Sequence, residues 1–131
     1  MNPELAIYNE CWNLAADCGY KVFQTLPREG VKVDYPFIHV ESSQLLTNRS
    51  SKEKLSGRVS IIISVWGQEH QRGTVAHIGS SLYEKVSNTT NLEGGLTAQF
   101  LPSRSLIQIL PDTTTNEILW RARMLIEFNF N

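Results

Sequence analysis

Histidines, cysteines and carboxylates are the residues of this sequence that could bind a metal, act as nucleophiles or transfer protons. The only histidines are His39, His70 and His77, and neither the His-x-x-x-His nor the His-Glu-x-x-His spacing of a helical zinc site occurs. No Gly-x-Ser-x-Gly nucleophile elbow is present, and Gly94-Gly95 belongs to no phosphate-cradling loop. The sequence therefore predicts no catalytic residue, no metal ligand and no cofactor.

The two cysteines, Cys11 and Cys18, are seven residues apart. On one helix this spacing separates them by about 10 Å, which is too far for a disulfide between them. We expect two small apolar side chains in a reducing compartment.

The carboxylates of Asp34, Glu41 and Asp112 are scattered along the chain. A small enzyme or ligand-binding domain is the distant alternative, which a deep polar pocket with converging titratable groups would indicate.

The net charge of −1 argues against extensive nucleic-acid binding, but the charge is unevenly distributed. Residues 48–58 carry a single carboxylate, Glu53, and four basic side chains: Arg49, Lys52, Lys54 and Arg58. Either this basic arm docks on an acidic partner, protein or DNA, or it is a solvated loop. No aromatic residues are interleaved for base stacking, so at most non-specific contact with DNA is expected.

The apolar spacing predicts two helices within a single domain of residues 1–131. Asn2-Pro3-Glu4 is a helix-start signal, and the first helix is expected over residues 3–18, with an apolar stripe of Leu5, Tyr8, Trp12 and Ala15. The second is expected over residues 74–87, with its stripe at Val75, Ile78, Leu82 and Val86. Gly79 in this helix is either a cost in helix propensity or a point of close backbone approach.

Alternating and β-branched segments predict strands at residues 20–24, 36–40, 59–65, 96–101, 104–110 and 120–130. In the last strand Trp120, Ala122, Met124, Ile126, Phe128 and Phe130 share one face, and the charged residues lie mainly on the other. The polar segment 42–57 joins two strands and would form either a projecting hairpin or a disordered loop. The expected fold class is α+β, an antiparallel sheet of about four to five strands with two packed helices and one long polar hairpin arm.

Nothing in the sequence indicates a membrane span or an export signal. Wholly apolar runs such as Ile61-Ile62-Ile63 are far shorter than the roughly 18 residues of a transmembrane helix. The chain does not open with a basic region followed by an apolar one, so we expect it in the cytoplasm, without a membrane partner.

Seven short segments appear in a characteristic order between Val22 and Phe130. They are Val22-Phe23, Tyr35-Pro36-Phe37-Ile38, the strand ending Val65-Trp66, the helix through Ile78 and Leu82, Leu92-Glu93-Gly94-Gly95, Pro111-Asp112 and the closing strand. In this order the chain resembles the tail-completion or tail-terminator (head-to-tail joining) proteins of long-tailed bacteriophages. It departs from the family pattern at Thr113-Thr114-Thr115-Asn116, where a glycine-containing turn would be expected.

This resemblance implies a structural protein rather than an enzyme. Family members are α+β domains that assemble as hexameric rings on the tail tube, end its elongation and offer the surface on which the head docks. The implied partners are further copies of the chain, the tail tube protein and the head-completion connector, with DNA passing through the lumen. The implied location is the host cytoplasm during assembly and then the head-tail junction of the virion. A head-completion or stopper connector is the nearer alternative.

The hypothesis for the basic residues is that Arg49, Lys52, Lys54 and Arg58 face an acidic partner or the lumen. On the charged face of the last strand, Arg121 and Arg123 are weaker candidates for subunit pairing.

Overall fold

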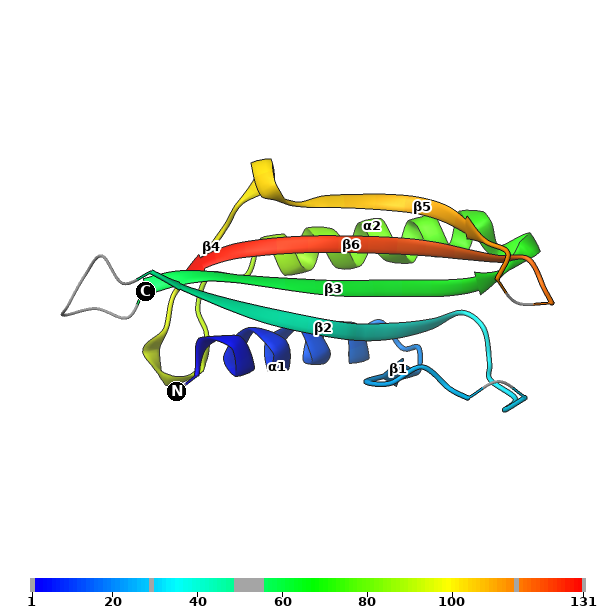
Figure 1. Ribbon diagram of the computed structural model, residues 1–131, viewed down its shortest axis with the longest axis horizontal. Helices are drawn as coiled ribbons and strands as arrows, with labels where there is room; N and C mark the ends of the chain where they lie inside the picture. The colour runs from blue at the N-terminus through cyan, green and yellow to red at the C-terminus, as the bar shows by residue number, and fades with distance from the viewer. Residues whose placement is uncertain (1, 29, 49–55, 115, 131) are drawn as a thin grey trace.

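The computed structural model describes residues 2–28, 30–48, 56–114 and 116–130 (Figure 1). Within these residues the chain forms α1 (Pro3–Ala16), β1 (Val22–Phe23), β2 (Phe37–Asn48), β3 (Ser56–Gln68), α2 (Arg72–Ser87), β4 (Ala98–Phe100), β5 (Leu106–Asp112) and β6 (Leu119–Phe130). The α+β class expected from the sequence is confirmed. Of the basic arm, Arg49, Lys52 and Lys54 lie outside the described residues.

The strands form one sheet in the order β1-β2-β3-β6-β4, and β5 also pairs with β6. β4 pairs with the last residues of β6, from Phe128 to Phe130, whereas β5 pairs with its first part, from Leu119 to Leu125. These two strands therefore follow one another along the same edge of β6, separated by a short 3₁₀ turn at Pro102–Arg104. All pairs are antiparallel except β1 with β2, which is parallel, so the sheet is mixed rather than purely antiparallel.

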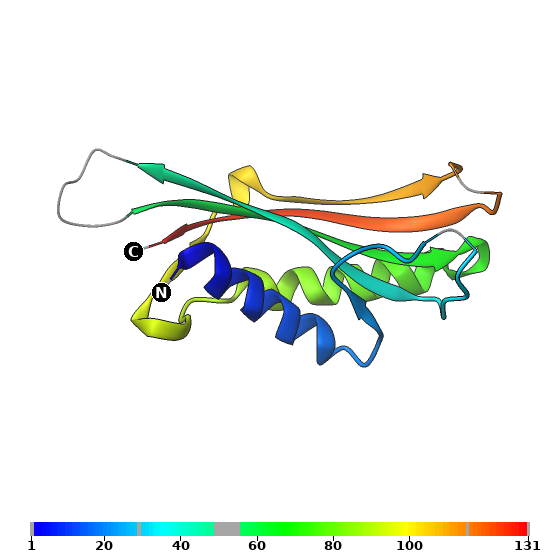
Figure 2. The same ribbon diagram turned by 60° about the horizontal axis from the view of Figure 1, so that its bottom comes forward.

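The sheet has one covered and one uncovered face. Figure 2 shows α1 and α2 on the same side of it. The side chains that point toward the helices come from alternate strand positions, as the period of two requires. They form the main core with the buried helix residues, and in the central strands they are Val59, Ile61, Ile63, Val65, Ala122, Met124, Ile126, Phe128 and Phe130. The predicted apolar face of the last strand is confirmed, although Trp120 is only partly buried.

The second helix matches its prediction closely. Its four predicted stripe residues are all buried against the sheet: Val75, Ile78, Leu82 and Val86. Gly79 is the point of close approach, because a Cβ atom built there would lie 2.8 Å from the Cβ of Ala122 and 3.2 Å from the Cδ1 of Ile107. Within the described residues, no helix has both the length and the apolar character that crossing a membrane requires.

The first helix begins as predicted, but its buried face is shifted from the predicted stripe: Ala15 is buried, Tyr8 and Trp12 are partly buried, and Leu5 is not. The Asn2 side chain caps it by accepting hydrogen bonds from the amides of Glu4 (2.8 Å) and Leu5 (3.4 Å). The helix ends at Ala16 rather than at residue 18, and Leu5, predicted to lie in the apolar stripe, is 46% exposed. The buried side chains are the smaller or β-branched ones, Pro3, Ala6, Ile7, Cys11 and Ala15. Small side chains let the helix axis approach the sheet closely, which leaves bulkier neighbours at the margin.

The hairpin of β2 and β3 is longer than the sequence suggested. The two strands pair from Phe37 opposite Trp66 to Asn48 opposite Ser56, and β3 continues to Gln68, beyond the predicted strand end at residue 65. β3 also pairs with β6 as far as Gly57 opposite Phe130. The described part of the hairpin is therefore integrated into the sheet.

Alanine substitutions at two glycines of α2 test the close approach. Gly79→Ala gains up to about 1 kcal/mol of helix propensity, but the new Cβ must displace Ala122, and overpacking of this kind costs about 1–3 kcal/mol. We expect a net loss of stability, measured as the midpoint of chemical denaturation. Gly73→Ala is the matched control, because a Cβ there meets nothing within 4 Å. Gly73→Ala should leave the midpoint unchanged or raise it, and equal behaviour of the two variants would refute the steric account.

Candidate functional site

The side of the sheet away from α1 and α2 is covered by no helix of the described residues (Figure 2). We call it the open face and define it by the side chains that alternate, along β2, β3, β5 and β6, with those that face the helices. Because its strands are held by the core beneath, side chains from distant parts of the chain have fixed places on it. An open sheet face of this kind is suited to contact with another macromolecule.

An apolar row crosses the middle of the open face. Ile62 of β3 is the register partner of Leu125 of β6, which in turn is the partner of Leu106 of β5. Ile62 and Leu125 are partly exposed and Leu106 is 42% exposed. Contiguous exposed apolar side chains with a polar surround are typical of protein interaction sites. The row therefore marks a candidate contact surface.

A polar network lies beside this row. The guanidinium of Arg121 donates to the carboxylate of Glu41 (2.6 Å) and to the hydroxyl of Ser64 (2.9 Å), which itself donates to Glu41 (2.7 Å). Arg121 also stacks over the ring of Trp66, with its Cζ atom 5.0 Å from the ring centroid. Burial alone would raise the pKa of the Glu41 carboxyl, but the hydrogen bonds from Ser64 and Arg121 outweigh this and hold the pKa below its usual range.

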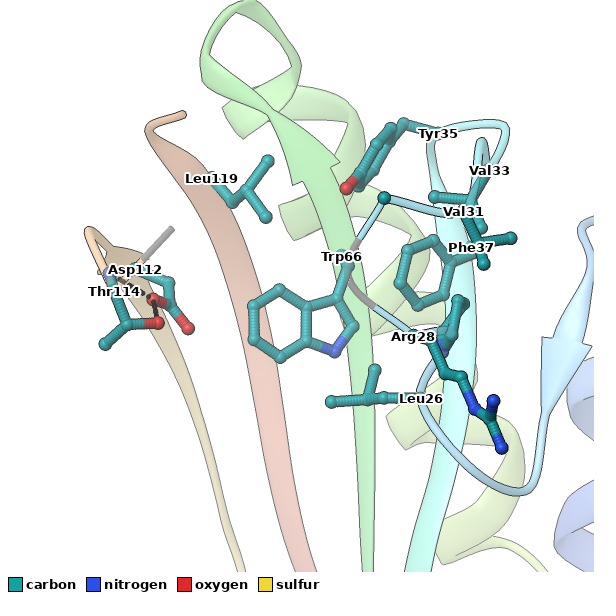
Figure 3. A pocket seen from close by; sticks show the side chains of 12 residues that line it. Leu26, Arg28, Val31, Val33, Tyr35, Phe37, Trp66, Asp112, Thr114 and Leu119 are labelled. Atoms are coloured by element: carbon teal, nitrogen blue, oxygen red, sulfur yellow. Dashed lines mark hydrogen bonds between the residues drawn. The ribbon is translucent and has the colours of Figure 1, made fainter. Parts of the chain in front are cut away.

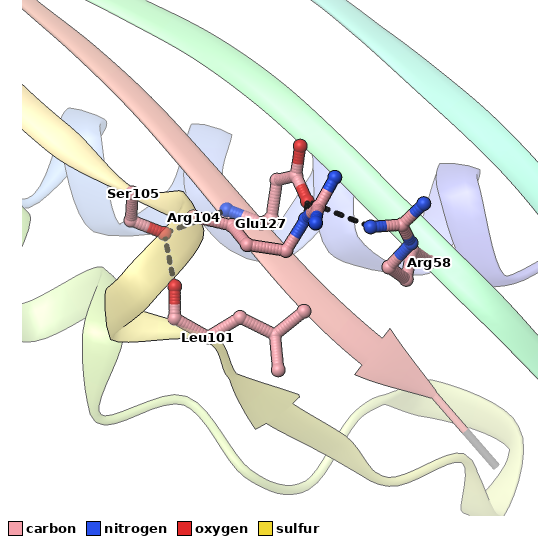
Figure 4. A network of polar contacts seen from close by, with 5 residues as sticks. All are labelled: Arg58, Leu101, Arg104, Ser105 and Glu127. Atoms are coloured by element: carbon pink, nitrogen blue, oxygen red, sulfur yellow. Dashed lines mark hydrogen bonds and ion pairs between the residues drawn. The ribbon is translucent and has the colours of Figure 1, made fainter.

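A second network lies toward the other end of the open face (Figure 4). The Glu127 carboxylate accepts a hydrogen bond from Nε of Arg104 (2.7 Å) and lies 3.7 Å from the guanidinium of Arg58. The Ser105 hydroxyl accepts from the Glu127 amide (3.0 Å) and donates to the carbonyl of Leu101 (2.8 Å). Two arginines thus share one carboxylate, which leaves this end of the face locally positive.

The predicted site residues within the described chain share this face but differ in their environment. Arg58 and Arg121 are engaged in the ion pairs just described. Arg123 lies between the networks, opposite Ser64 on β3 and Gln108 on β5, and makes no ion pair with the described residues. Of the three, Arg123 is therefore the cation most available to a partner.

Sequence reasoning missed the apolar row and the two acidic partners. Leu125 interrupts the charged side of the last strand, and Ile62 lies on the polar side of its own strand. These two apolar residues at otherwise polar positions are the sequence signal from which the row could have been predicted. Glu41 and Glu127 lie 80 and 23 positions from Arg121 and Arg104, so no local spacing indicates these pairs.

The described residues contain no group of three or more His, Cys, Asp or Glu side chains placed to hold a metal ion. Burial raises the pKa of the Cys11 thiol to about 12, so this cysteine is a protonated core side chain rather than a nucleophile. Burial likewise lowers the pKa of His39, whose Nε2 lies 3.2 Å from the carbonyl oxygen of Gln24. These groups serve packing.

Comparison with solved structures gives a fold match along almost the whole chain. The fold is similar to that of a chain in the structure described as the virion of a native gene transfer agent (GTA) particle, with a TM-score of 0.62 and 14% sequence identity. The match covers 97% of this chain and 94% of that one. No protein-family model and no curated protein matches the sequence.

Replacing Glu41 tests the network around Arg121. Glu41→Gln removes a charge-assisted hydrogen bond from a partly buried arginine and should lower the free energy of unfolding by about 1–2 kcal/mol near neutral pH. The folded-state pKa of Glu41 lies below its ordinary value of about 4.3. The contribution of Glu41 to the free energy of unfolding is therefore fully present at pH values above the ordinary pKa and is lost as the pH falls through the lowered folded-state pKa.

The measurement is the difference in denaturation midpoint between the original chain and Glu41→Gln as a function of pH. We expect the difference to shrink as the medium is acidified. Glu84→Gln, at an exposed position of α2, is the control and should show no such trend. A difference that persists unchanged in acid would contradict the role given to the carboxylate.

Proposed function

We propose that this chain is a structural, non-enzymatic virion protein that caps the tail tube of a long-tailed phage, ends tail elongation and forms the docking surface for the head. The observation that carries this proposal is the fold likeness, over 97% of the chain, to a chain of a particle described as a virion. The ordered motifs that resemble the tail-terminator family supply the specific role.

The open face fits a subunit that works inside an assembly. Interfaces typically have an apolar centre and a polar rim, and the row Ile62, Leu125 and Leu106 is flanked by Arg123 and the two arginine-carboxylate networks. A head-to-tail contact between identical subunits closes into a ring when its rotation allows. We propose a hexameric ring in which the open face meets the neighbouring subunit.

The remaining partners follow from this role. The ring would sit on the tail tube protein on one side and meet the head-completion connector on the other. The basic segment 48–58 would face an acidic partner or the lumen, where contact with DNA is non-specific. The protein would be made in the host cytoplasm and end at the head-tail junction. A head-completion or stopper connector is the second candidate, because a virion likeness fits it equally well.

Tail length separates the two candidates. In particles assembled without this gene, a terminator role predicts overlong tails without heads, because nothing stops tube growth. The measurement is tail length by electron microscopy. Tails of normal length beside unjoined heads would assign the protein to the head-side connector, and normal joined particles would refute a structural role in joining.

A charge reversal on the open face tests the proposed subunit contact. Arg123→Glu should prevent ring formation and reduce the yield of joined particles by at least about tenfold, because a buried like-charge or unpaired-charge contact costs on the order of several kcal/mol. Its fold should be retained, since Arg123 makes no ion pair with the described residues. Lys85→Glu, exposed at the end of α2 on the covered side, is the matched control. Normal yield from Arg123→Glu would place the subunit contact elsewhere.

A further inference from the structure

Strand β5 forms one edge of the sheet. It pairs with β6 on one side, and in Figures 1 and 2 no other element of the described chain lies beyond its other side. The backbone amides and carbonyls along such an edge are a template for pairing with a further strand. Edge strands are commonly protected by charged side chains, prolines or bulges, but residues 106–110 contain none of these. The edge of β5 is therefore available to a partner strand.

The side chains of this edge are apolar as well as uncharged. Leu106 and Leu110 lie on the open face and are 42% and 37% exposed. Ile107 and Ile109, on the other side of the strand, pack against the core but remain partly exposed. A segment of high β propensity without charge, placed on an exposed edge, tends to associate with another strand.

The sequence of the edge is complementary to itself. Leu106-Ile107-Gln108-Ile109-Leu110 reads the same in both directions around Gln108. In an antiparallel pair of two copies, with a two-fold axis at Gln108, Leu106 of each copy faces Leu110 of the other, and Ile107 faces Ile109. Residues directly opposite one another share a face of the sheet, so leucine meets leucine on the open face and isoleucine meets isoleucine beside the helices. The two Gln108 amides meet at the centre.

The carboxyl end of β5 is negative. It leads into a pocket of about 390 Å³ whose floor is the small apolar cluster of Phe37, Trp66 and Leu119, from β2, β3 and β6 (Figure 3). Asp112 lies in the wall of this pocket and accepts hydrogen bonds from the amide and hydroxyl of Thr114 (2.9 and 2.6 Å). Because these donors are neutral and Asp112 makes no ion pair with the described residues, its charge can pair with a cation of another chain.

The amino end of β5 is positive. Arg104, in the 3₁₀ turn just before the strand, has a side chain that is 51% exposed and shares the carboxylate of Glu127 with Arg58. The antiparallel arrangement around Gln108 brings Arg104 of one copy toward Asp112 of the other at both ends of the pair. Opposite charges thus meet twice, whereas a parallel pairing of the same strands would place like charges together.

We propose that β5 pairs with β5 of a second copy of this chain, so that the two sheets join into one across a two-fold axis at Gln108. An isologous contact of this kind uses the same surface on both copies and closes after two. Since the contact between two such short strands is small, the pair is weak and forms as the protein concentration rises. The inference is independent of the proposed function, because it uses the edge of the sheet and is measured on the isolated chain.

Charges placed at the two-fold axis test this pairing. Gln108 is exposed, so the fold should tolerate Gln108→Lys and Gln108→Glu. In Gln108→Lys two like charges face each other across the axis, and we expect the dissociation constant of the pair to rise at least about threefold. An equal mixture of Gln108→Lys and Gln108→Glu should associate more tightly than either variant alone, because lysine then faces glutamate. The measurement is sedimentation equilibrium over a range of protein concentrations.

Gln99→Lys is the matched control. Gln99 is an exposed glutamine of β4, which follows the same edge of β6 but lies outside the proposed pair. This variant should associate as the original chain does. Three outcomes would overturn the inference: an original chain that stays single at every concentration, association that is equal in all variants, or a mixture that associates no better than its two components. The last would indicate that β5 pairs with a different strand of the second copy.

Discussion

The pairing of β3 with β6 is the constraint on which the rest of the structure depends. These two central strands run antiparallel from Gly57 opposite Phe130 to Gln68 opposite Leu119. Their inward side chains form most of the sheet's share of the core beneath both helices, and a register slip of one residue would exchange the two faces entirely. The same pairing brings Ser64 next to Arg123 and Ile62 next to Leu125, so the open face and the core are specified together.

A β-bulge in the neighbouring strand β2 gives the part of the open face around Glu41 its polar network. The register of β2 shifts between Val40 and Ser42, as a β-bulge does. Val40 points into the core, whereas Ser42 pairs with Ile62 on the open side, so Glu41 is the inserted position. The inserted residue reaches both Ser64 and Arg121. A bulge that re-aims a carboxylate toward an arginine is a feature of the site rather than a defect of the strand.

The sequence predicted what depends on the periodicity of single elements and missed what depends on contacts between them. The stripe of α2 and the inward face of β6 were correct because a long, regular pattern specifies each of them. The stripe of α1 was wrong at Leu5 because the face that packs on the sheet is centred on Ile7, Cys11 and Ala15. The network around Arg121 and the pocket floor each combine residues from three strands, which no local spacing indicates.

The polar network around Arg121 contacts the floor of the pocket directly. Glu41 fixes the guanidinium of Arg121, Arg121 covers one face of the Trp66 ring, and Trp66 forms the pocket floor. A free indole would sample several rotamers, and fixing it on binding would cost part of the interaction energy. Here the Trp66 ring is already fixed in the folded protein, because the ion pair between Arg121 and Glu41, the inserted residue of the β2 bulge, holds the guanidinium over it. The partly buried ion pair of the open face therefore holds the ring of Trp66 in a fixed orientation.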